Sequence, residues 1–127
     1  MGRFYWNKRT GEGHLLGLDY FQQAIDEDPE YGLAYAGLAD TYYLMGLMGY
    51  IDQKEGRDKA VELSKKALRL DDQLSEAHTV LASIYTYIDR NWEAAEKEYQ
   101  IAIQINPNYP TVHQYYSEHL SITGRHT

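Results

Sequence analysis

The chain has 127 residues, of which 43% are hydrophobic, and it carries a formal net charge of −7. This excess of acidic residues argues against a nucleic acid partner, because phosphate backbones are bound by clustered Lys and Arg side chains. The absence of cysteine excludes disulfides and metal sites built on sulfur, and no apolar run or leader pattern predicts membrane insertion or secretion. We therefore expect one domain and, by default, a cytoplasmic location.

The first third of the chain predicts two helices separated by a proline. Residues 2–8 resemble the end of a helix, and Thr10–Gly13 should interrupt it, because two glycines in four positions disfavour a helix. From Leu15 to Ile25, apolar residues recur at intervals of 3, 3 and 4 residues, the period of one helical face. Asp28-Pro29 should end this helix, because proline restricts the residue before it and lacks a backbone N–H.

The next helix is expected from about Tyr31 to Gly46. The following segment, Leu47–Gly56, is apolar for a loop and leaves two interpretations open. It forms either a long helix-turn-helix crossing or a lid over a binding surface. The helix after it has alanine and leucine on one side and charged residues on the other, as expected of a helix with one solvent-exposed face.

Three more helices complete the chain. The first follows Asp71-Asp72, and Asp89–Asn91 forms the turn to a second helix over Trp92–Ile105. Asn106–Asn108 ends that helix, and the last one runs from Tyr109 to Ile122. About seven helical segments and no strand pattern result, so the predicted class is all-α.

An eight-residue pattern recurs where helices end. It begins with a small and an apolar residue, continues through a polar break with Pro or Asp, and closes on a large apolar residue that starts the next helix. The copies are Ala24–Tyr31, Ala67–Leu74 and Ala102–Tyr109, separated by 43 and 35 residues. An internal repeat of this length predicts supersecondary units that stack on one another.

Antiparallel helix pairs that repeat about every 34 residues are typical of tetratricopeptide repeats, and the residues of this chain resemble that family. A bulky residue, a Leu-Ala pair and a Tyr stand on the first helix of a repeat, and alanines with a final Pro or Asp stand on and after the second. In the second repeat these are Tyr35, Leu38, Ala39, Tyr42, Ala60, Ala67 and Asp72; in the third, His78, Leu81, Ala82, Tyr85, Ala95, Tyr99, Ala102 and Pro107. Gly17, Phe21, Ala24 and Pro29 mark a first repeat, and His113, Tyr116 and Leu120 a fourth.

The resemblance implies a right-handed α-solenoid of antiparallel helix pairs over the whole chain. It divides the chain into a partial repeat over 1–29, a repeat over 30–72 with a long connection, a repeat over 73–107 and a partial repeat over 108–127. We expect a piece cut from a larger bacterial protein, in which Tyr115, Tyr116 and Leu120 have no helix to cover them. Two copies should then associate through their open terminal helices.

The resemblance also implies a concave groove lined by fixed positions of the first helices. Chaperone-binding members hold a peptide carboxylate there with Lys, Arg and Asn, whereas this chain has Asp40, Ser83 and Glu118. The expected partner is therefore a protein or peptide segment that is neutral or basic and partly apolar. The predicted groove residues are Leu33, Ala36, Asp40, Tyr43, Leu44, Glu76, Thr79, Ser83, Thr86, Tyr87, Thr111, Gln114, Glu118, Ser121 and Ile122, with Arg3, Trp6 and Asn7 from the first partial helix.

No set of residues predicts catalysis, a metal or a cofactor. His113 and His119 are six residues apart, which places them on different faces of a helix. His78 and His113 occupy the bulky position that Tyr35 holds, so we expect them to pack. Since no nucleophile, base and orienting group assemble, we expect a non-catalytic interaction scaffold. Two alternatives stay open: a structural module for self-assembly, and a scaffold whose groove positions only face solvent.

Overall fold

The computed structural model describes residues 11–123, which form six α-helices and contain no strand. The all-α prediction is confirmed. The helix expected over residues 2–8 lies outside the described residues, as do Arg3, Trp6 and Asn7. The helices are α2 (Gly11–Glu27), α3 (Gly32–Met48), α4 (Gln53–Leu70), α5 (Ser75–Tyr87), α6 (Trp92–Ile105) and α7 (Pro110–Thr123).

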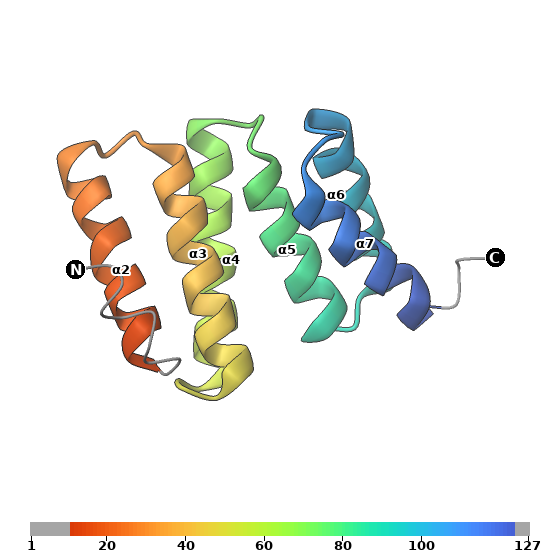
Figure 1. Cartoon of the computed structure of the whole chain (residues 1–127), viewed down its shortest axis with the longest axis horizontal. Coiled ribbons are helices and arrows are strands. Elements are labelled where there is room, and N and C mark those ends of the chain that lie inside the picture. The colour runs from red at the N-terminus through yellow and green to blue at the C-terminus, as the bar shows by residue number, and fades with distance from the viewer. Residues whose placement is uncertain (1–10, 124–127) are drawn as a thin grey trace.

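The helices stack in the order of the sequence. Each helix contacts the next one along the chain, and in addition α3 contacts α5 and α5 contacts α7. Figure 1 shows the result: α3, α5 and α7 lie side by side in one layer, and α4 and α6 lie behind them. This arrangement is that of a helical solenoid, in which each pair of helices is covered by its neighbours.

The three copies of the eight-residue pattern form the same turn. In each copy an Asp or Asn side chain accepts a hydrogen bond from the backbone N–H two residues later, which is an Asx turn. The acceptors are separated by 43 and 35 residues, the spacings of the sequence repeat. The repeat in sequence is therefore a repeat of one local structure. The bonds join Glu30 N to Asp28 Oδ1 at 3.2 Å, Gln73 N to Asp71 Oδ1 at 3.0 Å, and Asn108 N to Asn106 Oδ1 at 3.3 Å.

The connection between α3 and α4 is shorter than the sequence predicts. Only residues 49–52 lie between the two helices. Gly49 ends α3 with φ of 86°, the left-handed conformation that glycine adopts without strain. Asp52 then caps α4, because its carboxylate accepts a 3.0 Å hydrogen bond from Glu55 N. The extra residues lengthen the two helices, so the lid interpretation of Leu47–Gly56 is wrong.

Gly46 and Gly56 lie inside helices and do not end them. A Cβ atom on Gly56 would lie 2.7 Å from the carbonyl oxygen of Tyr42 and 3.1 Å from Gly46 Cα. The two glycines therefore mark the place where the backbones of α3 and α4 approach closely. Gly11 and Gly13 lie inside α2, which begins at Gly11, so these two glycines do not interrupt it. The helix over residues 2–8 that they were expected to end lies outside the described residues.

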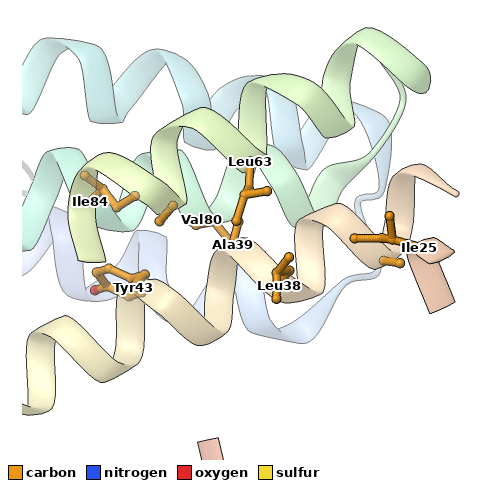
Figure 2. Close-up of a cluster of buried hydrophobic side chains, with 9 residues drawn as sticks. Ile25, Leu38, Ala39, Tyr43, Leu63, Val80 and Ile84 are labelled. Carbon is orange, nitrogen blue, oxygen red and sulfur yellow. The ribbon is translucent and has the colours of Figure 1, made fainter. Parts of the chain in front are cut away.

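One cluster of the core consists mainly of side chains that α3, α4 and α5 direct toward one another, with Ile25 from α2. Figure 2 shows Leu38 and Tyr43 from α3, Leu63 from α4 and Ile84 from α5 in this cluster. Fully buried alanines occur at the helix contacts, because only a small side chain lets two helices come close at normal packing density. They are Ala39, Ala60, Ala67, Ala77, Ala82, Ala95 and Ala102.

The C-terminal helix is better covered than the sequence predicts. Tyr115, Tyr116 and Leu120 are all half-buried, so the expectation that they lack a cover is wrong. The Tyr116 ring packs against that of Tyr99 with 5.4 Å between centroids, and its hydroxyl donates a 2.5 Å hydrogen bond to the Glu96 carboxylate. The reason is that α7 lies against both α5 and α6. The exposed residues of α7 are mainly polar: Pro110, His113, Gln114, Ser117, Glu118, Ser121 and Ile122.

None of the helices within residues 11–123 combines the length and the apolar character required to cross a bilayer.

Candidate functional site

A cavity of about 270 Å³ lies between α3, α5 and α7. Its volume equals that of about nine liquid waters and is below the roughly 300–1,000 Å³ of sites for drug-sized ligands. The cavity therefore has room for one or two amino acid side chains. The lining residues are Leu33, Ala36, Gly37 and Asp40 of α3; Glu76, Thr79, Val80 and Ser83 of α5; Tyr109 before α7; Thr111 and Tyr115 of α7; and Phe21 of α2.

Helix periodicity explains how these residues come to face one space. On α3 and on α5, the lining positions follow the spacing i, i+3, i+4 and i+7, which places side chains on one helical face. The layer of α3, α5 and α7 then brings the three faces together. Seven of the predicted groove residues line the cavity: Leu33, Ala36, Asp40, Glu76, Thr79, Ser83 and Thr111.

Three other predicted groove residues belong to the helix packing. Tyr43 is 3% exposed and Thr86 is fully buried. The Thr86 hydroxyl donates a 2.9 Å hydrogen bond to the carbonyl oxygen of Ala82. Leu44 is half-buried and packs on the core cluster that includes Leu38. These side chains are enclosed by neighbouring helices and do not line the cavity.

The remaining predicted groove residues are Tyr87, which ends α5, and four residues of α7. None of them lines the cavity. The Tyr87 hydroxyl donates a hydrogen bond to the Glu118 carboxylate, which connects α5 to α7. Burial raises the pKa of Tyr87, and Glu118 raises it further. Gln114, Ser121 and Ile122 are exposed on α7. Glu118 therefore stabilises the contact between two helices.

Asp40 is the most unusual group in the cavity. Its carboxyl is half-buried, and burial raises its pKa from 3.8 to about 6. Among the side chains of residues 17–122, none donates a hydrogen bond to it or forms an ion pair with it. A carboxylate that has lost water and gained no partner is energetically costly.

The charged residues in the wall of the cavity are all acidic. The lining residues include a second acid, the half-buried Glu76, and none of them is Lys, Arg or His. Burial raises the pKa of the Tyr109 hydroxyl, and the Glu76 and Asp40 carboxylates raise it further. Burial and the Asp40 and Glu118 carboxylates act in the same direction on Tyr115. The cavity therefore favours positive charge.

Sequence reasoning missed lining residues that helix spacing could have identified. Gly37 and Val80 stand four residues after the predicted groove residues Leu33 and Glu76. Tyr115 stands in the same relation to Thr111. Adding the i+4 neighbour of each predicted position would have found all three, since these neighbours share a helical face.

Phe21 and Tyr109 had no such signal. Phe21 reaches the cavity across Gly37, where a Cβ atom would lie only 2.4 Å from the ring carbon Cε1. Tyr109 precedes α7, so no helical period applies to it. The Phe21 contact depends on how α2 packs against α3, and the Tyr109 contact depends on the turn between α6 and α7.

Three histidines lie among the residues whose side chains the structure describes, and each has a contact within the fold. His78 Nδ1 lies 2.6 Å from Glu98 Oε1, between α5 and α6, and His113 Nε2 contacts the carbonyl oxygen of Pro107. His119 is fully buried, with its ring centroid 5.3 Å from that of Tyr99. Among the described side chains of residues 17–122, no group of three or more His, Asp or Glu is arranged to hold a metal ion.

The chain is similar in fold to a known peptide-binding domain. The first tetratricopeptide repeat domain of Spaghetti (RPAP3), solved with the HSP90 peptide SRMEEVD, matches 97% of this chain and 89% of that chain. The TM-score is 0.69 at 15% sequence identity. No protein-family model and no curated protein sequence matches the chain. The chain therefore has the tetratricopeptide repeat fold, as its residue pattern predicts.

Proposed function

We propose that the chain is a non-catalytic interaction module that binds a peptide, or an extended segment of a partner protein, on the face formed by α3, α5 and α7. The observation that carries this proposal is the cavity between these helices, which is large enough for side chains of a ligand. The fold supports it, because a domain of the same fold has been solved with a bound peptide.

The proposed ligand is neutral or basic and partly apolar. Apolar and aromatic residues supply much of the cavity wall, and Asp40 and Glu76 supply its charge. An acidic peptide such as SRMEEVD would place negative charge beside these carboxylates, and such like-charge contacts are unfavourable. We therefore do not extend that ligand to this chain.

Self-assembly through the terminal helices is the other candidate. Its basis was an uncovered apolar surface on α7, but the tyrosines of α7 are half-buried and its exposed residues are mainly polar. No specific observation favours this candidate, and it serves as an alternative outcome of the experiment below.

A selection experiment tests the proposal. Short random peptides displayed on phage are selected against the wild-type chain, and the affinities of the enriched peptides are then measured by titration. We expect enriched peptides whose affinity falls at least about tenfold in Asp40→Lys, because the new ammonium repels a basic ligand and fills the cavity.

Glu62→Lys is the matched control. Glu62 is exposed on α4, outside the cavity lining, and its substitution changes net charge by the same amount. Circular dichroism verifies that both variants fold, and light scattering follows the oligomeric state. The proposal is wrong if no peptide is enriched, or if Asp40→Lys binds as well as Glu62→Lys. Concentration-dependent oligomers together with either result would favour self-assembly.

A further inference from the structure

We propose that the cavity between α3, α5 and α7 is a pocket for one arginine side chain of the bound segment, with Asp40 as its counter-ion. This inference rests on the peptide-binding function proposed above and names the group that gives that function its specificity. Its basis is the geometry of the cavity, in which the polar groups of α3 and α5 are arranged to accept hydrogen bonds.

The threonine and serine hydroxyls of α5 cannot readily donate into the cavity. Thr79 Oγ1 donates a 2.8 Å hydrogen bond to the carbonyl oxygen of Ser75, and Ser83 Oγ donates a 2.9 Å bond to that of Thr79. Each hydroxyl has one hydrogen, so these two groups keep only lone pairs for a ligand. The carboxylates of Asp40 and Glu76 are acceptors as well. The α3 and α5 side of the pocket therefore favours a ligand group that is rich in donors, and the hydroxyls of Tyr109, Thr111 and Tyr115 can accept from such a group as well.

Asp40 requires that this group be positively charged. Its carboxyl is half-buried, and no described side chain, in residues 17–122, neutralises it. The raised pKa, about 6, reflects this cost of burial. A cation of the ligand would supply the opposite charge that the fold itself does not place there.

Guanidinium suits this pocket better than ammonium does. It has five N–H donors and no acceptor, so it can donate to carboxylates and hydroxyls in several directions at once. It is also more weakly hydrated than ammonium, and its flat faces stack on aromatic rings. Phe21, Tyr109 and Tyr115 provide such rings in the wall of the cavity.

The volume agrees with a side chain as the occupant. At about 270 Å³ the cavity holds an arginine side chain together with a few waters. A bare metal ion is a poorer occupant, because the cavity wall contributes only two carboxylates, Asp40 and Glu76, and no histidine.

The experiment compares peptides selected by three proteins: the wild-type chain, Asp40→Asn and Glu62→Gln. Both variants lose one negative charge, but only Asp40 lines the cavity. We expect arginine at one fixed position of the peptides enriched by the wild-type chain and by Glu62→Gln. Asp40→Asn should enrich peptides without a fixed arginine.

Affinities of one enriched peptide and its analogues then locate the contact. Replacing the fixed arginine with citrulline, which keeps the shape but removes the charge, should weaken binding to the wild-type chain at least about 30-fold. The same replacement should change binding to Asp40→Asn by less than about threefold, because the partner charge is already gone. Lysine at that position should bind more weakly than arginine.

The outcomes separate this inference from the function on which it rests. Enriched peptides with no fixed cation, or a citrulline effect that persists in Asp40→Asn, would overturn the arginine pocket and leave the peptide-binding function standing. Equal binding of lysine and arginine would overturn the assignment to arginine. Failure to enrich any peptide would overturn both.

Discussion

In the unbound protein, the ionised carboxylate of Asp40 lowers the free energy of unfolding, because it is half-buried and no described side chain neutralises it. Burial raises its pKa for the same reason. The folded-state pKa of about 6 lies above the unfolded value of 3.8. Between these two values the folded chain binds more protons than the unfolded chain, so the free energy of unfolding falls as pH rises through this window. The stability that protonated Asp40 provides is fully present below the unfolded pKa and is lost above about pH 6.

Asp40→Asn should therefore stabilise the protein at neutral pH. Since burial raises the pKa of Asp40 from 3.8 to about 6, and a tenfold change in proton affinity corresponds to about 1.4 kcal/mol, we expect a gain of up to about 3 kcal/mol near pH 7. The gain should nearly vanish near pH 3, below both pKa values, where Asp40 is mostly protonated in the folded and the unfolded state. Urea unfolding at a series of pH values measures this. A variant that is less stable than the wild-type chain at neutral pH would contradict the explanation.

Gly37 provides a second test at the scale of a residue. A Cβ atom there would lie 2.4 Å from Phe21 Cε1, so Gly37→Ala must displace the ring. Alanine gains about 1 kcal/mol over glycine in a helix, but overpacking costs about 1–3 kcal/mol. We expect a net loss of about 1 kcal/mol in denaturant unfolding.

Phe21→Leu supplies the control for this substitution. With the shorter side chain in place, Gly37→Ala should no longer clash and should become neutral or stabilising. A double-mutant cycle gives the coupling between the two positions. Additive effects would mean that the ring does not lie against Gly37.

At the scale of helices, close contact depends on alanine. Ala102 of α6 is fully buried in the cluster that also contains Tyr99 and Val112. Ala102→Leu should therefore overpack this contact and lower the free energy of unfolding by about 1–3 kcal/mol. Gln104→Leu is the control, because Gln104 is exposed on the same helix. Thermal melts of the two variants that do not differ would show that α6 does not pack through Ala102.

An ion pair connects α4 to the turn after α5. Arg57 Nε and Nη2 donate to the two carboxylate oxygens of Asp89 at 3.0 and 2.6 Å. Exposed pairs contribute little, but this one is bidentate and both side chains are less than a third exposed. We expect a coupling energy of about 1 kcal/mol from a double-mutant cycle with Arg57→Ala and Asp89→Ala.

Arg57→Lys refines that measurement. Lysine keeps the charge but cannot form the bidentate contact, so it should lose a large part of the coupling energy. Full retention of the coupling by lysine would show that the geometry of the pair contributes nothing.

The sequence predicted helices and turns well where the signal was local. The Asx turns at Asp28, Asp71 and Asn106 follow directly from the repeated pattern, because the side chain bonds to its own backbone. Glycines were misread, because the sequence does not distinguish a glycine that ends a helix from one that lets two helices touch. Gly46 and Gly56 have the second role.

The sequence predicted part of the candidate site and missed the rest. The resemblance to the repeat family identified Leu33, Asp40 and Glu76 among the lining residues. It also selected Thr86, which neighbouring helices bury completely, and it missed Phe21, which arrives from another helix. Burial depends on how helices pack across the layer, and this information is not contained in the spacing within one helix.

For the whole molecule, the stack of helices explains why one face carries the proposed function. Consecutive contacts place α3, α5 and α7 in one layer and α4 and α6 in the other (Figure 1). Residues at equivalent positions of three helices then line a common cavity. The division into repeats, the bacterial origin and association through terminal helices stay predictions.

The central claim is that this layer binds a ligand segment through the cavity. Amide chemical-shift mapping by NMR, in a titration with an arginine-containing peptide from the selection, tests it most directly. We predict that the largest changes fall in residues 33–40, 76–83 and 109–115, and that the exposed positions of α4 and α6 do not change. Shifts confined to α4 and α6, or no shifts at saturating peptide, would contradict it.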